Sequence, residues 1–138
     1  MTEVKISKKS LLALPITFIV LGAVLTIVFY ILNREAVEIQ GYSLGMIIVG
    51  IYCLCKNANY CKKSYLKYDE HHVEGYVHLS KKKYTRIDEE LKNVTISNGK
   101  RKSIIIENDE GTFIIVYVVN AKEHVTRMND YKENYSKS

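Results

Sequence analysis

An uncharged apolar run near the N-terminus constrains this chain more than any other feature. Residues 11–32, LLALPITFIVLGAVLTIVFYIL, contain no charged side chain. At about 1.5 Å per residue, a helix of this length reaches about 33 Å and matches a hydrocarbon core about 30 Å thick. A signal peptide would have an apolar region of about 7–15 residues and a small-residue cleavage site, and a buried helix of a soluble protein would carry a polar stripe. The run therefore predicts a transmembrane helix.

A second uncharged run, GYSLGMIIVGIYCLC, covers residues 41–55. As a helix it would reach only about 22 Å, but extension to residues 39–57 brings it near spanning length, because Lys56 can snorkel to the interface. We expect a second transmembrane helix over residues 39–57. An interfacial or re-entrant segment is the alternative.

Small residues indicate how the two helices meet. Glycine lets helix backbones approach closely in a membrane. We expect one small-residue face of the second helix to pack against small residues of the first helix. The face comprises Gly41, Gly45 and Gly50, and its partners are Gly22 and Ala23.

Lysines flank the apolar runs and are absent between them. Lys5, Lys8 and Lys9 precede the first run, and Lys56, Lys62, Lys63 and Lys67 follow the second. The connecting loop of residues 33–38 contains one basic residue, Arg34, and two glutamates. Since positive residues stay inside, we expect residues 1–10 to be a cytoplasmic tail and residues 33–38 a short external loop. The sequence thus predicts a multi-pass protein of the cell (plasma) membrane with both termini cytoplasmic.

The three cysteines, Cys53, Cys55 and Cys61, lie at or just past the inner end of the second helix. An odd count on the reducing side of a membrane argues against a disulfide framework. Their C-x-C-x5-C spacing does not match a zinc site. We expect small apolar helix residues, with acylation at the membrane as the alternative.

The rest of the chain, residues 62–135, has the patterns of a small antiparallel β domain. Residues 73–79 alternate between apolar and polar, and residues 112–119 form a β-branched and aromatic run. Asn98-Gly99 is a turn dipeptide that predicts a hairpin. Asn120-Ala121-Lys122-Glu123 has the pattern of a capping box and begins a helix that we expect over residues 121–133.

The order of these features resembles the bacterial pleckstrin-homology-like (PH-like) domains. The resemblance rests on an apolar-Gly start, an I-x-x-x-I-x-x-V-like stretch, two glycine turns, an aromatic strand and an Asn-Ala-x-Glu helix start. Here these are Gly75, then Ile87, Leu91 and Val94, then Gly99, Ile104, Ile106, Gly111, Phe113 and Asn120-Ala121-Lys122-Glu123. The resemblance covers about half the chain and implies a two-sheet, partly open barrel with a helix over one end. The expected fold is thus an α+β membrane protein, with two transmembrane helices followed by a PH-like barrel or sandwich capped by one C-terminal helix.

Catalytic and metal-binding motifs are missing from the sequence. It contains no G-x-S-x-G, Walker loop, G-x-G-x-x-G or H-E-x-x-H pattern. We interpret His71 and His72 as exposed turn residues, since neighbours on a strand point to opposite faces. The run Asp88-Glu89-Glu90 is typical of a solvated face on a short loop. We expect no enzyme activity, no catalytic residue, no cofactor and no metal.

Two basic clusters remain as candidate contact residues for lipid headgroups or a partner. They comprise Lys81, Lys82, Lys83 and Arg86, and Lys100, Arg101 and Lys102. From residue 62 onward the chain has fifteen basic and twelve acidic side chains, a net charge of only +3. Nucleic acid binding calls for a wide surface of one sign, so we expect no nucleic acid partner. Solvated turns are the simplest interpretation, and a surface facing headgroups or a partner is the functional one.

Two functions are consistent with these features. The first is a non-enzymatic, membrane-anchored scaffold of the PH-like kind, whose cytoplasmic barrel contacts a protein partner, its own copies in a homo-oligomer, or anionic headgroups of the lipid bilayer. The alternative is an accessory subunit of a membrane transport or export complex that acts through its transmembrane hairpin.

Overall fold

The computed structural model describes residues 1–32, 37–78 and 85–137. The chain forms two compact units, which are described separately here. The helical unit is Lys8–Ala58, and the β unit combines Met1–Ser7 with Asn59–Ser138. Within the described residues the architecture is α+β, with two long apolar helices, two small antiparallel sheets and one C-terminal helix. The predicted α+β class is therefore confirmed.

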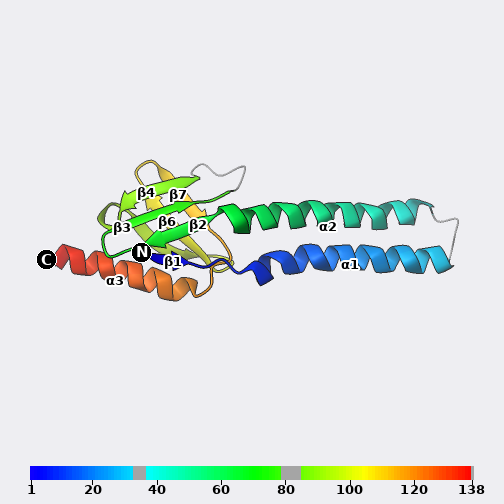
Figure 1. Ribbon diagram of the computed structural model, residues 1–138, viewed down its shortest axis with the longest axis horizontal. Coiled ribbons are helices and arrows are strands. Elements are labelled where there is room, and N and C mark those ends of the chain that lie inside the picture. The colour runs from blue at the N-terminus through cyan, green and yellow to red at the C-terminus, as the bar shows by residue number, and fades with distance from the viewer. Residues whose placement is uncertain (33–36, 79–84, 138) are drawn as a thin grey trace. The chain divides into compact units, whose positions relative to one another are not determined.

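The helical unit contains α1, Lys8–Leu32, and most of α2, Val37–Lys63, which lie antiparallel and side by side (Figure 1). Both helices are long and apolar enough to cross a membrane. Most of their large apolar side chains are exposed, whereas a core helix of a soluble protein would bury them. The second helix continues past residue 57, where we expected the span to end, and so carries Tyr60 and Cys61 as well.

Close contact between the helices depends on Gly22 and Gly50. A Cβ atom on Gly22 would lie 2.8 Å from Cγ1 of Ile47 and 2.9 Å from the carbonyl oxygen of Ser43. A Cβ atom on Gly50 would lie 2.6 Å from Cγ1 of Ile19. Such distances leave no room for a side chain, so both glycines lie in the interface, as predicted. The predicted pairing of small residues with each other was wrong, because Gly22 packs against Ile47 and Gly50 packs against Ile19.

The prediction of a place in the interface was wrong for Gly41 and Gly45, because a Cβ atom on either would meet nothing within 4 Å. Helix geometry explains the difference, since five residues turn a helix by about 140° and nine residues by about 180°. Gly45 and Gly41 therefore point away from the face of Gly50. A hydrogen bond of 2.8 Å between Thr26 Oγ1 and Ser43 Oγ joins the helices on the contact face.

The first sheet begins with a strand that the sequence analysis did not find. It contains β1 (Thr2–Val4), β2 (Tyr65–Tyr68), β3 (His72–Tyr76) and β4 (Arg86–Glu90), in that order. β1 pairs with β2 in the register Thr2↔Tyr68, although the whole helical unit separates them in sequence (Figure 1). Residues 1–10, which we expected to form a tail, thus supply an edge strand whose Val4 is buried.

The acidic run Asp88-Glu89-Glu90 is not a loop, as we expected, but most of β4. Its residues pair with β3 in the registers Glu74↔Asp88 and His72↔Glu90. Because alternate residues of a strand face opposite sides, Asp88 and Glu90 are exposed on the outer face while Ile87 is buried. Strand pairing, which sequence composition does not reveal, therefore organises these carboxylates.

The second sheet contains three strands. They are β5 (Thr95–Gly99), β6 (Ser103–Asn108) and β7 (Gly111–Ile115), and the 3-10 helix η1 (Leu91–Asn93) precedes them. The turn from β6 to β7 is held by the side chain of Asn108, whose Oδ1 accepts hydrogen bonds from the backbone N–H groups of Glu110 and Gly111, at 3.0 and 2.9 Å. A short polar side chain at this position is a common way to satisfy a turn.

The turn predicted at Asn98–Gly99 is displaced by two residues, since the observed turn comprises residues 100–102. The observed register pairs buried Ile96 with buried Ile106. Burial of a strand face fixes register more strongly than a turn dipeptide does.

The C-terminal helix α3, Ala121–Lys137, begins where the capping pattern predicted and extends beyond residue 133. It packs on β5, β6 and η1 and buries Ala121, Val125 and Met128, as their helical spacing predicted. The largest fully buried side chains of the β unit include Tyr60, Leu66, Tyr68, Ile87, Leu91, Ile104, Ile106, Phe113 and Ile115. The core of the β unit therefore draws on both sheets, on α3 and on the end of α2.

Candidate functional site

The second basic cluster, Lys100, Arg101 and Lys102, forms the turn between β5 and β6, and its side chains are exposed. Arg101 and Lys102 have left-handed backbone conformations, with φ angles of 57° and 53°. Such a conformation costs a non-glycine residue about 1–3 kcal/mol and persists only where the surrounding structure holds it in place. The hydrogen bonds of residues 116–119 supply this support.

Residues 116–119, which follow β7, connect several distant parts of the β unit. The backbone N–H of Tyr117 donates to the carbonyl of Arg101 at 3.2 Å, and that of Val118 donates to Lys102 at 2.9 Å. The N–H of Val119 donates to the carbonyl of Lys5, also at 2.9 Å. The basic turn and the N-terminal segment are therefore bound to the same stretch of backbone.

A surface hollow of about 650 Å³ lies beside the basic turn. Its lining includes Lys102 from the turn, Lys122 from the first turn of α3, and Ser7 from the N-terminal segment. Glu123 also lines the hollow and supplies the opposite charge. Ser7 is the last residue before α1, so the hollow lies beside a point where the chain leaves the β unit.

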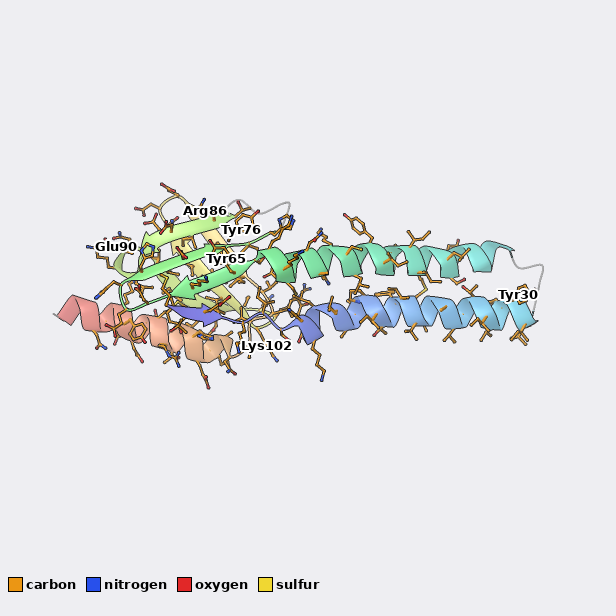
Figure 2. All side chains as sticks on the ribbon, viewed as in Figure 1. Tyr30, Tyr65, Tyr76, Arg86, Glu90 and Lys102 are labelled. Atoms are coloured by element: carbon orange, nitrogen blue, oxygen red, sulfur yellow. The ribbon has the colours of Figure 1, made fainter. Side chains whose placement is uncertain are left out.

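Of the first basic cluster the structure describes only Arg86, which does not line this hollow. Residues 81–83 lie outside the described residues, and Arg86 begins β4, where it is exposed and pairs with Tyr76. In Figure 2 Arg86 and Lys102 lie on opposite sides of the β unit. Among the described residues, the candidate contact surface comprises Lys100, Arg101 and Lys102, together with Lys122, which was not among the candidates from sequence.

A mixed cluster on the outer face of the first sheet was missed in the sequence. The ligand-capable atoms of His72, Glu74 and Asp88 all lie within 4.8 Å of one another. His72 Nε2 contacts Asp88 Oδ1 directly. His72 is thus not the exposed turn residue that we expected, because β3 begins with it and its ring meets β4. The signal was the i, i+2 spacing of His72 and Glu74, which places both on one face of a strand.

A second polar pair joins α3 to the core. Tyr68 Oη and His124 Nδ1 are 2.7 Å apart, and their rings meet edge to face. Burial raises the pKa of the Tyr68 hydroxyl above its ordinary value. Burial, with repulsion from Arg127, lowers the pKa of His124. Both shifts favour the neutral forms, in which the hydroxyl can donate to the ring nitrogen.

The three cysteines do not form disulfides in the structure. Cys55 is exposed, and Cys53 and Cys61 are partly buried, all on α2. All three therefore lie on a helix, as we expected.

A comparison with protein families, with curated proteins and with solved structures found no match to this chain.

Proposed function

We propose that this chain is a non-enzymatic, membrane-anchored scaffold. Its helical unit crosses the membrane twice, and its β unit, a PH-like domain, contacts the anionic headgroups of the cytoplasmic leaflet. The contact surface is the basic turn of Lys100, Arg101 and Lys102, with Lys122 beside it. The observation that carries the proposal is the position of this turn, which is bound to the same backbone segment as the N-terminal residues that lead into α1.

Strand pairing supports a double crossing. β1 precedes α1 and β2 follows α2, yet the two strands pair residue by residue from Thr2↔Tyr68 to Val4↔Leu66. Paired strands must lie on one side of a membrane, so the helices between them cross it an even number of times. The lysines that flank both helices favour the cytoplasm as that side.

The order of elements supports the PH-like assignment. Four strands in one antiparallel sheet, three in the next and one C-terminal helix agree with the two-sheet barrel and closing helix that the resemblance implies. Residues that carry the resemblance lie in these strands. Gly75 lies in β3, Gly111 begins β7, and Phe113 is buried in the core.

Electrostatics supports headgroups as the ligand. A lysine or arginine near an anionic leaflet contributes about 1 kcal/mol, and this attraction falls off over about 8 Å at physiological ionic strength. The exposed side chains of Lys100, Arg101 and Lys102 meet this requirement only if they lie close to the bilayer. Ser7, which lines the same hollow as Lys102, is followed directly by α1.

The test is vesicle binding by a soluble version of the β unit, in which Met1–Ser7 is joined to Asn59–Ser138 by a short Gly-Ser linker. We expect co-sedimentation with vesicles that contain phosphatidylserine and not with pure phosphatidylcholine vesicles, and binding should weaken as salt is raised.

The matched comparison neutralises two sets of basic residues. The variant Lys100→Gln/Arg101→Gln/Lys102→Gln should lose vesicle binding. The control variant Arg86→Gln/Lys92→Gln, which alters exposed residues outside the hollow, should keep most of it. Equal binding by the two variants would refute the assignment of the basic turn. Folding of every variant is checked by circular dichroism, since surface changes of this kind usually alter stability by no more than about 0.5 kcal/mol.

A further inference from the structure

Three side chains from two neighbouring strands converge on the outer face of the first sheet. His72 and Glu74 come from β3 and Asp88 comes from β4, and the register places Glu74 directly opposite Asp88. One imidazole nitrogen and two carboxylate groups lie within 4.8 Å of one another. The side chains of His72 and Asp88 are 35% and 57% exposed, so they can rotate without disturbing the core.

The backbone beneath these residues is held in place. Asp69 Oδ1 accepts hydrogen bonds from the backbone N–H groups of His71, at 2.8 Å, and of His72, at 2.7 Å. These bonds fix the turn that leads into β3. Buried Val73 anchors the strand next to His72 on the opposite face. A rigid support of this kind keeps ligand groups in position.

Within the cluster Asp88 contacts His72, but among the described residues no ion pair involves Glu74. Two carboxylates directly opposite each other on neighbouring strands repel. Lys67 pairs with Glu74 from β2, but its ammonium group lies over the ring of Tyr65, 5.6 Å from the ring centre. Among the described residues, no ion pair joins Lys67 to Glu74. A cation between the carboxylates would remove this repulsion.

We propose that His72, Glu74 and Asp88 bind a divalent transition-metal ion of the zinc class. Zinc accepts imidazole nitrogen and carboxylate oxygen at about 2.0–2.2 Å, and tetrahedral ligands at that distance are about 3.3 Å apart. Small side-chain rotations bring the three groups from their present spacing to this geometry. Three protein ligands leave one tetrahedral position for water, and His72 also borders an open hollow of about 410 Å³.

The ion would join β3 to β4 across the sheet, with His72 and Glu74 on one strand and Asp88 on the other. It therefore acts as a cross-strand clip, and a ligand that binds only the folded state stabilises that state. This site is separate from the basic turn of the proposed function, because no residue is shared between them.

The experiment uses the full-length protein in detergent, with Cys53→Ser, Cys55→Ser and Cys61→Ser as background, because thiolates would bind zinc on their own. Bound zinc is measured by equilibrium dialysis and atomic emission. We expect one zinc ion per chain. We expect each of three single substitutions to weaken zinc binding: His72→Ala, Glu74→Gln and Asp88→Asn. The loss should be about 10–100-fold or more, because removal of a residue that only supports a metal ligand already costs that much.

His71→Ala is the matched control, since His71 is the neighbouring histidine but is not part of the cluster. It should leave zinc affinity unchanged. Thermal unfolding gives a second readout: zinc should raise the melting temperature of the background protein and of His71→Ala, but not that of Glu74→Gln, which keeps the shape of the side chain. Absence of stoichiometric zinc, or an equal loss in His71→Ala and His72→Ala, would overturn the proposal.

Discussion

The hydroxyl of Tyr60 bonds both backbone groups of Val116. It accepts a hydrogen bond from the N–H at 2.9 Å and donates one to the carbonyl at 3.2 Å. Next to Val116, the carbonyl of Tyr117 accepts a hydrogen bond from the N–H of Ser7 at 2.6 Å. The chain leaves the β unit after Ser7 and re-enters it at Asn59, so Ser7 and Tyr60 lie at the two junctions with the helical unit. Both junctions are therefore fastened to one short segment of backbone.

Removal of the Tyr60 hydroxyl should destabilise the β unit. In Tyr60→Phe the N–H and carbonyl of Val116 lose their partner, and the site is only 2% exposed. Leaving buried polar groups unsatisfied costs about 1–3 kcal/mol. Urea unfolding of the soluble version, followed by circular dichroism, measures the loss. Tyr65→Phe, on the outer face of β2, is the control, and an equal unfolding midpoint for the two variants would contradict the role of Tyr60.

The β unit should fold without the helical unit, provided that both junctions are kept. Met1–Ser7 joined by a short linker to Asn59–Ser138 retains β1 and Tyr60, and we expect a soluble, cooperatively unfolding domain. A fragment that begins at residue 62 lacks the buried side chains of Val4 and Tyr60. Deleting large apolar core groups typically costs about 2–5 kcal/mol each. The fragment should therefore have a much lower melting temperature, and equal melting would show that β1 is dispensable.

Stability should fall at mildly acidic pH because of His124. Its pKa is lowered by burial and by Arg127, so the folded state binds this proton less tightly than the unfolded chain does. The contribution of the neutral ring is complete above the ordinary value of about 6.5 and is lost as pH falls from there toward the lowered folded value.

The charged and titratable groups that face His124 are Tyr68 on β2 and Glu123 and Arg127 on α3. His124→Gln should flatten the dependence of the unfolding midpoint on pH between about pH 7.5 and 5.5. A wild-type slope in His124→Gln would assign the effect to other groups.

Helix contact can be tested at the glycines. Gly50→Leu would force a side chain into the space occupied by Ile19, while Gly45→Leu meets open space. Thr26→Cys/Ser43→Cys, with the native cysteines replaced by serine, reports the contact, because the Thr26 and Ser43 hydroxyls are 2.8 Å apart. Oxidation should form a disulfide readily with Gly45→Leu and slowly with Gly50→Leu. Equal rates would mean that Gly50 does not set the helix spacing.

The proposed membrane orientation, with both termini in the cytoplasm, can be tested with reporters. A reporter fused after Ser138 should be active only in the cytoplasm, and one placed before Met1 should behave in the same way, because β1 and β2 pair. Digestion of the β unit by protease added to intact cells would reverse the assigned orientation. Reporters on opposite sides would be incompatible with the pairing itself.

The sequence predicted the elements whose signal is local. An uncharged run of 22 residues is enough to indicate an apolar helix, and the spacing of Ala121, Val125 and Met128 is enough to indicate the buried side of α3. β1 gave no such signal, because three residues show no period and their partners in β2 lie more than sixty residues away.

The candidate sites also depend on strand pairing that could not be predicted from the sequence. His72 and Asp88 meet only because β3 and β4 adopt one register, and the sequence analysis assigned Asp88 to a loop. The basic residues were identified as candidates, but nothing in their spacing indicated that Lys122 lies beside Lys102 or that Arg86 lies on another side.

The pairing of β1 with β2 also bears on the order of events during synthesis. Val4 leaves the ribosome first, and its partner Leu66 follows sixty-two residues later. At about 5–20 residues per second this is a delay of about 3–12 s, during which both long apolar helices are made. The first strand of the sheet is thus translated well before its partner, so a change to Thr2–Val4 would act on the finished core of the β unit.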